Sequence, residues 1–281
     1  MKRPPPSRET RGRAEQSASA RRERREGLGG EQVEGLRAVR ELLVARRRRV
    51  RDIWMSDLAD RDNPLVVEIT DLAREAKVPI REVGRARLDA AAGSRAPQGV
   101  IAHAAPLTEH DVDALCRTRR NQPPFLVVLE GLTDPRNLGA VLRSADGAGV
   151  TGVVVPRHRA VHLTPAATKA AAGAIEYLRM ALVPGIPNAL QTLGKAGVWT
   201  IGLDGDAASS IYDLELATEP VAVVLGSEGS GLSRLARDRC DALASIPQLG
   251  GLPSLNVGAA AAIACYEVAR RRLEALEFDG D

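Results

Sequence analysis

The chain has 281 residues, of which 44% are apolar, enough to build a sizeable core in one large domain or two smaller ones. It has no apolar run of the ~20 residues that span a bilayer and no apolar stretch after Met1 of the kind that directs secretion, so we expect a cytoplasmic protein. Its three cysteines form no C-x-x-C pair, which argues against a disulfide framework and against a metal site.

Positive charge is concentrated near the N-terminus, although the net charge is only +3. Nine Lys and Arg face four Glu in the first thirty residues, and we predict that residues 1–33 form a disordered basic tail suited to a polyanion. A second run, Arg46 to Arg49 with Arg51, is either a solvated helix end or an RNA contact. The chain has only two Trp, three Tyr and two Phe, so RNA binding would depend on phosphate charge and shape, not on base stacking.

Residues 34–105 read as a small α/β domain. The apolar spacing predicts helices over 35–48, 71–76 and 86–92 and strands over 53–55, 78–83 and 99–102. A polar stretch that ends in Pro123-Pro124 follows, and we take residues 106–124 as a linker.

From residue 125 to 281, strand and helix signals alternate. We predict strands over 125–130, 152–155, 179–183, 198–203, 221–225 and 243–247, and helices over 138–148, 165–174, 187–196 and 256–276. This alternation predicts a mostly parallel sheet with helices on both faces. The small side chains of Ala259 to Ala262 in the last helix allow close packing of backbone or of a second subunit.

Three segments of this second half share one pattern, an apolar strand that runs into a loop of Gly, Asn or Ser. The loops are 134–139, 226–231 and 253–257. Small residues after the carboxyl ends of buried strands let backbone N–H groups approach a ligand, so we predict one binding site built from three strand ends.

Each segment also has a simpler interpretation. Asn137, Ser254 and Asn256 are all typical helix caps. Arg143, in the first turns of a helix, suits a phosphate or a carboxylate. The loop around Glu228 fits neither the Walker pattern nor G-x-G-x-x-G, which argues against those nucleotide sites, and Glu228 is either a solvated carboxylate or one held for a purpose.

The three motifs in this order resemble the SpoU branch of the trefoil-knot (SPOUT) RNA ribose 2′-O-methyltransferases. The matching stretches are Asp134-Pro-Arg-Asn-Leu-Gly-Ala-Val-Leu-Arg143, Gly226-Ser-Glu228-Gly-Ser-Gly-Leu-Ser233, and Ile246-Pro247 through Ser254-Leu-Asn256-Val257. The first unit, with Gly35-Leu36-Arg37 and Gln98-Gly99-Val100, is similar to the L30e-like RNA-binding domain of the large-subunit rRNA guanosine methyltransferases. Pro97 and Gly258 depart from that pattern, where His and Ser are frequent.

The resemblance implies a trefoil-knotted domain over 125–281 that forms a homodimer through the knot and the final helix. It implies that S-adenosylmethionine is held by backbone groups around Gly202, Gly226, Ile246 and Leu255. It also implies Arg143 as the central catalytic residue, surrounded by Asn137, Glu228, Ser254 and Asn256, with no metal.

Methyl transfer to a ribose hydroxyl requires in-line placement and removal of a proton. A guanidinium stays protonated in proteins, so we interpret Arg143 as a phosphate anchor and oxyanion stabiliser. Glu228 either orders Asn137 or Arg143 or takes the proton itself, and the proton acceptor stays open.

We therefore interpret the chain as an S-adenosylmethionine-dependent RNA 2′-O-ribose methyltransferase that acts on a guanosine of 23S rRNA. Three alternatives stay open: the same reaction on tRNA, methylation of an rRNA adenosine that confers antibiotic resistance, and a non-catalytic RNA-binding or ribosome-assembly factor that keeps the knot only for dimerisation.

Overall fold

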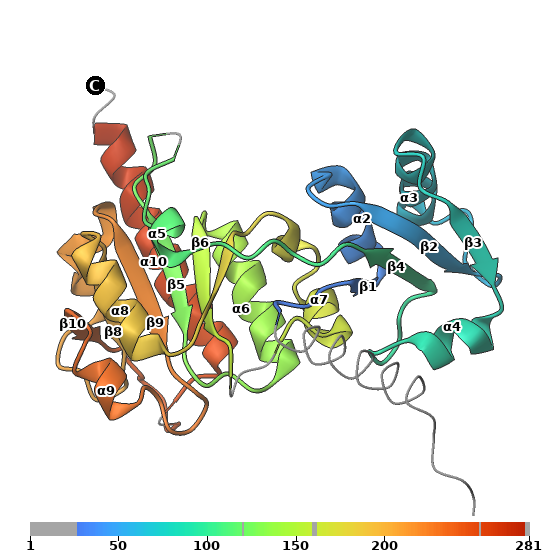
Figure 1. Ribbon diagram of the computed structural model, residues 1–281. Coiled ribbons are helices and arrows are strands. Elements are labelled where there is room, and N and C mark those ends of the chain that lie inside the picture. The colour runs from blue at the N-terminus through green and yellow to red at the C-terminus, as the bar shows by residue number, and fades with distance from the viewer. Residues whose placement is uncertain (1–26, 120, 159–161, 253, 279–281) are drawn as a thin grey trace, which may run out of the picture.

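The computed structural model describes residues 27–119, 121–158, 162–252 and 254–278, which form two sheets with their helices, side by side along a long molecule (Figure 1). Most of the predicted basic tail, residues 1–26, lies outside the described residues. The smaller sheet has the strand order β1-β4-β2-β3 and the larger one β10-β8-β9-β5-β6-β7. The predicted α/β class, with a mostly parallel second sheet, is confirmed.

The smaller unit is a mixed sheet with two helices on one face and one on the other. Its strands are β1 (Gln32–Glu34), β2 (Val50–Ser56), β3 (Ile80–Val83) and β4 (Val100–Ala104), and its helices are α2 (Leu36–Ala45), α3 (Pro64–Glu75) and α4 (Arg85–Ala91). Strand β4 is antiparallel to β1 and β2, whereas β2 is parallel to β3. The helix predicted over 71–76 is only the end of α3, which starts at Pro64 because the Asn63 side chain caps it. Strand β1 has three residues, too few to give a detectable pattern.

The segment predicted as a linker takes part in the second core. It contains α5 (Val112–Leu115), and the side chain of Leu115 is fully buried against the larger sheet. Glu109 forms an isolated bridge to Met180 at the edge of that sheet. Residues 106–124 are therefore fastened to the second unit along part of their length.

The larger sheet is entirely parallel and is covered on both faces. Its strands are β5 (Phe125–Leu129), β6 (Gly152–Pro156), β7 (Met180–Val183), β8 (Trp199–Leu203), β9 (Val221–Leu225) and β10 (Ala242–Ala244). The helices are α6 (Pro135–Gly147), α7 (Pro165–Ala170), α8 (Ile186–Lys195), α9 (Arg234–Arg237) and α10 (Val257–Phe278), with 3₁₀ turns η1 (Ala174–Glu176), η2 (Ile211–Asp213) and η3 (Glu215–Thr218). Val127 packs in the core under α6, α7 and α10, and its neighbours Leu126 and Val128 pack in the core under α5, α8 and α9. Burial on both faces explains why these strands are continuous apolar runs.

Some predicted boundaries are wrong for local reasons. The helix predicted over 165–174 stops at Ala170, because the chain turns through Gly173 at φ 99° and resumes as η1. The strand predicted over 243–247 ends at Ala244, and α9, a single turn capped by Ser233, gave no periodic signal.

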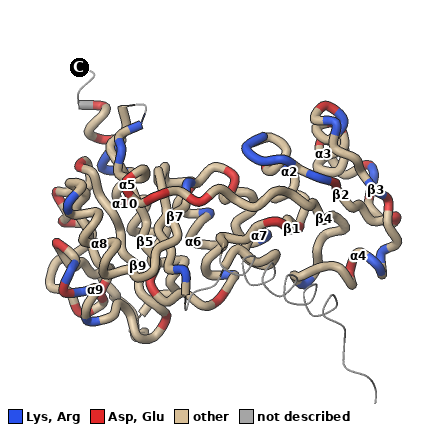
Figure 2. Tube along the Cα trace, in the orientation of Figure 1, with Lys and Arg blue, Asp and Glu red and all other residues tan. Residues whose placement is uncertain are grey.

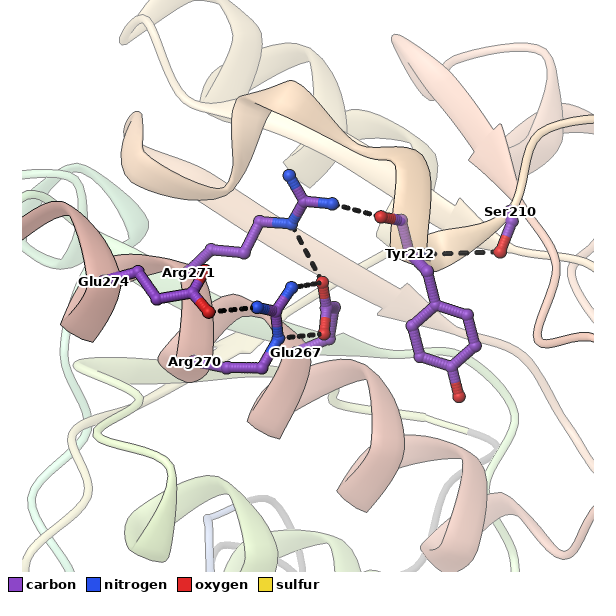
Figure 3. A network of polar contacts seen from close by, with 6 residues as sticks. All are labelled: Ser210, Tyr212, Glu267, Arg270, Arg271 and Glu274. Atoms are coloured by element: carbon purple, nitrogen blue, oxygen red, sulfur yellow. Dashed lines mark hydrogen bonds and ion pairs between the residues drawn. The ribbon is translucent and has the colours of Figure 1, made fainter.

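Helix α10 lies close against α6 and is joined to η2 by a polar contact. A Cβ added at Gly258 would lie 3.0 Å from the Cβ of Ala140, so small residues set this separation. Figure 3 shows Glu267 accepting hydrogen bonds from Arg270 and Arg271, and Arg271 also donating to the carbonyl of Tyr212 in η2. In the Ala259 to Ala262 run, Ala261 is fully buried, so part of the predicted close packing occurs within the chain.

No helix in the described ranges is long and apolar enough to cross a membrane.

Candidate functional site

An open cavity of about 710 Å³ lies at the carboxyl ends of β8, β9 and β10. Strands of a parallel sheet end at the same edge, so loops far apart in the sequence meet there. The cavity wall comes from the ends of β8 and β9, the loops that follow them, α9, the stretch between β10 and α10, and α10 itself. It consists of Leu203, Asp204, Gly205, Asp206, Leu225 to Gly231, Arg237, Ile246, Gln248, Ser254 to Val257 and Ala260. Loop 226–231 and residues 254–257 of the third predicted loop form part of this wall, whereas residues 134–139 of the first do not line it.

Three side chains meet at this edge, one from the first turn of α6, one from the 226–231 loop and one from the residue before α10. Asn137 Nδ2 donates to Glu228 Oε1 at 2.5 Å, and Asn256 Nδ2 donates to the same oxygen at 3.0 Å and to Asn137 Oδ1 at 3.1 Å. Both amide donors go to Oε1, and Oε2 of Glu228 accepts no hydrogen bond from the residues that the structure describes. The carboxylate is therefore held in one orientation with one oxygen available.

The helix cap at the first motif is a different residue from the one expected. Asp134 caps α6, its side chain accepting from Arg136 N at 2.8 Å, and this hydrogen bond together with the Arg136 side chain lowers the pKa of Asp134. The side chain of Asn137 is thus released for Glu228. Asn256 does both tasks, because its Oδ1 accepts from Gly258 N at 2.9 Å at the start of α10 while its Nδ2 binds Glu228.

The loop 226–231 is a tight turn that only glycine permits at one position. Ser227 and Gly231 exchange two backbone hydrogen bonds of 3.0 Å, and a Cβ added at Gly226 would lie 2.1 Å from the carbonyl carbon of Gly231. Beyond the turn, Glu130 accepts from Ser233 N and Oγ, both at 2.8 Å, and so joins the end of β5 to the start of α9. Sequence reasoning missed Glu130, since a lone Glu after a strand has no distinctive pattern.

Arg143 and Ser254 form no hydrogen bond with the Asn137–Glu228–Asn256 cluster in the part of the chain that the structure describes. Arg143 follows Asn137 by six residues, which at 3.6 residues per turn sets the two side chains about 120° apart around α6. Its side chain is exposed, does not line the cavity, and has no hydrogen-bond or ion-pair partner among the described residues. Ser254 is exposed on the cavity wall.

Of the four residues expected near the cofactor, Gly226, Ile246 and Leu255 line the cavity and Gly202 does not. A Cβ at Gly202 would point into the opposite core, 2.8 Å from side-chain carbons of Leu232 and Leu243, and its neighbour Leu203 forms the cavity wall instead. The wall also holds an ion pair that sequence reasoning missed, Arg237 Nη1 to Asp204 Oδ2 at 2.9 Å.

The cavity fits an adenosyl cofactor in size and in lining. Its volume is in the range of small-molecule sites, its wall combines apolar residues such as Leu203 and Ile246 with polar ones, and Gly226 has no side chain to block approach. No group of three or more His, Cys, Asp or Glu within the described ranges is arranged to hold a metal ion.

The basic run 46–51 follows α2 and continues into β2 (Figure 2), and its side chains have different surroundings. Arg46 pairs with Glu75, and Arg48 pairs with Glu176 in the second unit. Arg49 and Arg51, by contrast, line a second cavity of about 850 Å³, whose wall also includes His162 of the larger unit.

Two family models match the chain. The SpoU rRNA Methylase family matches residues 124–266, and the model described as RNA 2′-O ribose methyltransferase substrate binding matches residues 32–110. Among curated relatives, the 23S rRNA (guanosine-2′-O-)-methyltransferase RlmB of Photobacterium profundum is 38% identical over 252 residues, covering 87% of this chain and 99% of the relative. The protein of the same name from Shewanella oneidensis is 39% identical over 244 residues, covering 85% and 96%.

Solved structures agree with this assignment. A structure described as an RNA 2′-O ribose methyltransferase superimposes with a TM-score of 0.71 at 27% identity, covering 86% of this chain and 88% of the other. The SpoU methyltransferase AviRb from Streptomyces viridochromogenes shares the fold, with a TM-score of 0.72 at 24% identity and coverage of 87% and 90%. The chain belongs to the SpoU rRNA methylase family, as its three motifs predicted.

Proposed function

We propose that this protein transfers a methyl group from S-adenosylmethionine to the ribose 2′-hydroxyl of a guanosine in 23S rRNA. The observation that carries the proposal is the Asn137–Glu228–Asn256 cluster beside an adenosyl-sized cavity at three strand ends. Relatives that are 36–39% identical to this chain, and that align with it over almost their whole length, are named 23S rRNA guanosine 2′-O-methyltransferases.

The cofactor, when bound, supplies an electrophilic methyl group, and the chain positions and deprotonates the acceptor. Backbone at Leu203, Gly226, Ile246 and Leu255 holds the cofactor in the cavity. Glu228, oriented through Oε1 by two amides, keeps Oε2 for the ribose hydroxyl and its proton. Ser254 contributes a hydroxyl from the same wall.

Arg143 acts on the RNA side of this site. Its guanidinium is exposed and unpaired among the described residues, and a planar fork of donors binds a phosphate in bidentate fashion. A position on α6 off the cavity wall suits a nucleotide phosphate better than the methyl donor.

The chain organisation we propose has residues 34–105 as the RNA-substrate-binding domain, 106–124 as the connection and 125–281 as the catalytic domain with a trefoil knot. In support of the knot, the chain leaves β10 at the sheet edge and returns across the ends of β8 and β9, where Asn256 contacts Glu228. With ribosomal RNA as its substrate, the protein works in the cytoplasm.

The protein acts as a homodimer through the knot and the final helix. Tyr266 and Leu273, seven residues apart on α10, are 53% and 62% exposed on one face, and Ala259 precedes them by one further heptad. Light scattering of purified protein should give twice the chain mass, and Tyr266→Lys should shift it toward the monomer. A mass of one chain for the wild type would refute the dimer.

The deciding experiment uses tritiated S-adenosylmethionine with separate, unmodified 23S rRNA and tRNA, followed by nucleoside analysis. Label in 2′-O-methylguanosine from rRNA is the expected result. Label in tRNA or in 2′-O-methyladenosine would replace the substrate, and no label in RNA or in ribosomal particles would favour a non-catalytic binding factor. Arg143→Ala should abolish transfer while cofactor affinity stays unchanged.

A further inference from the structure

One arginine of the basic run is buried between the two units. Arg48 forms a bidentate ion pair with Glu176, Nη2 to Oε1 at 2.6 Å and Nε to Oε2 at 2.9 Å, and the two side chains are only 5% and 1% exposed. Its remaining donor, Nη1, reaches the carbonyls of Gly30 and Ala105, both at 2.7 Å. A single guanidinium thus joins the segment that enters the small unit, the segment that leaves it, and η1 of the larger unit.

Further contacts surround this ion pair. Tyr177 donates its hydroxyl to Glu41 Oε2 at 2.6 Å, and Arg47 donates to the Tyr177 carbonyl at 2.7 Å. A Cβ added at Gly173 would lie 2.2 Å from the Cβ of Glu41, so α2 rests directly on the backbone before η1. The junction is therefore specific in geometry and not a loose polar contact.

The same junction leads to the catalytic helix through packed elements. Turn η1 follows α7, and α7 lies against α6 so closely that a Cβ at Gly139 would be 2.4 Å from the Cβ of Ala170. Helix α6 carries Asn137 and Arg143. These packed contacts therefore connect the small unit to α6, the helix that carries part of the proposed site.

We propose that Arg48 and Glu176 are positioning residues that fix the RNA-substrate-binding unit relative to the catalytic cluster. The proposal rests on the proposed function, since it concerns an RNA that touches both units. Buried ion pairs add little net stability, but a bidentate guanidinium–carboxylate pair tolerates only one relative geometry. If the pair is lost, the binding-competent orientation becomes a fraction of the population, and the apparent affinity for RNA falls by that fraction.

The test replaces the pair by apolar side chains of similar length, Arg48→Met with Glu176→Met. The control is Arg234→Met with Asp238→Met, an ion pair at α9 of the larger unit whose side chains are 96% and 63% exposed. Spin labels at Val67→Cys and Lys195→Cys, both exposed, report the distance between the units without any need for activity.

We expect the double variant at the junction to broaden the label-to-label distance distribution and to raise KM for 23S rRNA roughly tenfold, as a tenfold drop in the competent fraction requires. The Kd for S-adenosylmethionine should stay within twofold, and the control should match the wild type in all three measurements. An unchanged distance distribution with an unchanged KM would overturn the proposal, as would parallel losses of RNA and cofactor binding.

A second variant and a readout that does not need activity cover the two ways in which this test could fail. If the double variant does not fold, Glu176→Gln replaces it, since the amide keeps the shape but accepts at only one atom, and the same split between RNA and cofactor is expected. If the wild type methylates no RNA, the proposed function fails, while the distance distribution and filter binding of rRNA still decide the positioning role.

Discussion

A single methyl group at Gly226 should disrupt the proposed cofactor site. In Gly226→Ala the new Cβ would collide with the peptide group between Gly231 and Leu232, 2.1 Å from Gly231 C, 2.3 Å from Gly231 O and 2.3 Å from Leu232 N. Ordinary contacts of a Cβ begin near 3.4 Å, so the 226–231 turn must move by about 1 Å or more. Backbone atoms cannot rotate away as a side chain can, and the whole turn that carries Glu228 has to shift.

The cost follows from overpacking, which destabilises by about 1–3 kcal/mol when neighbours must move. Because the displaced turn is itself the cavity wall, we expect the affinity for S-adenosylmethionine to fall by at least roughly tenfold, the equivalent of about 1.4 kcal/mol. Calorimetric titration measures this affinity, and urea unfolding of the same samples measures the loss of stability.

Gly205→Ala is the matched control. Gly205 lies on the same cavity wall, and nothing is within 4 Å of a Cβ added there, so its variant should bind the cofactor within twofold of the wild type. If Gly226→Ala binds as well as Gly205→Ala, the turn is pliable, and the argument that glycine is required there is wrong.

Three further predictions concern the Glu228 carboxylate, α10 and the thiols. Glu228→Gln keeps the shape but loses the charge, and should lower single-turnover methyl transfer by roughly 100-fold or more with cofactor affinity unchanged; a drop below threefold would exclude Glu228 from the chemistry. Arg272 donates to the carbonyls of Pro123, Pro124, Ala217 and Glu219 at 2.7–3.1 Å, so Arg272→Met should lower the free energy of unfolding in urea by about 2–4 kcal/mol. The control Arg234→Met, at a side chain that is 96% exposed, should lower it by less than about 0.5 kcal/mol, and equal losses for the two variants would contradict this prediction. Burial raises the pKa of Cys240 and Cys265 to about 12, so at pH 8 iodoacetamide should modify these two thiols only after unfolding. Mass spectrometry that finds either thiol modified in the folded protein would contradict this prediction.

The family and the larger sheet were readable from sequence because their signals are local. Five consecutive apolar residues at 125–129 and again at 221–225 indicate strands buried on both faces, and both strands appear at those positions. The three loops were recognisable because small residues directly after such strands are a contiguous pattern. The family resemblance of these loops implied a group of Asn137, Glu228, Ser254 and Asn256 around Arg143, and the structure joins Asn137, Glu228 and Asn256 by hydrogen bonds.

Tertiary structure decided what depends on partners distant in the sequence. Arg48 read as one of several surface arginines, and only the fold brings it to Glu176, 128 residues away. The sequence did not reveal that Asp134 caps α6 and so frees Asn137 for Glu228. It also did not reveal which face of β8 Gly202 lies on. A residue's type and neighbours specify its local conformation, whereas burial and pairing are properties of the contacts that form when elements pack, and those contacts decide which charges bind RNA and which hold the protein together.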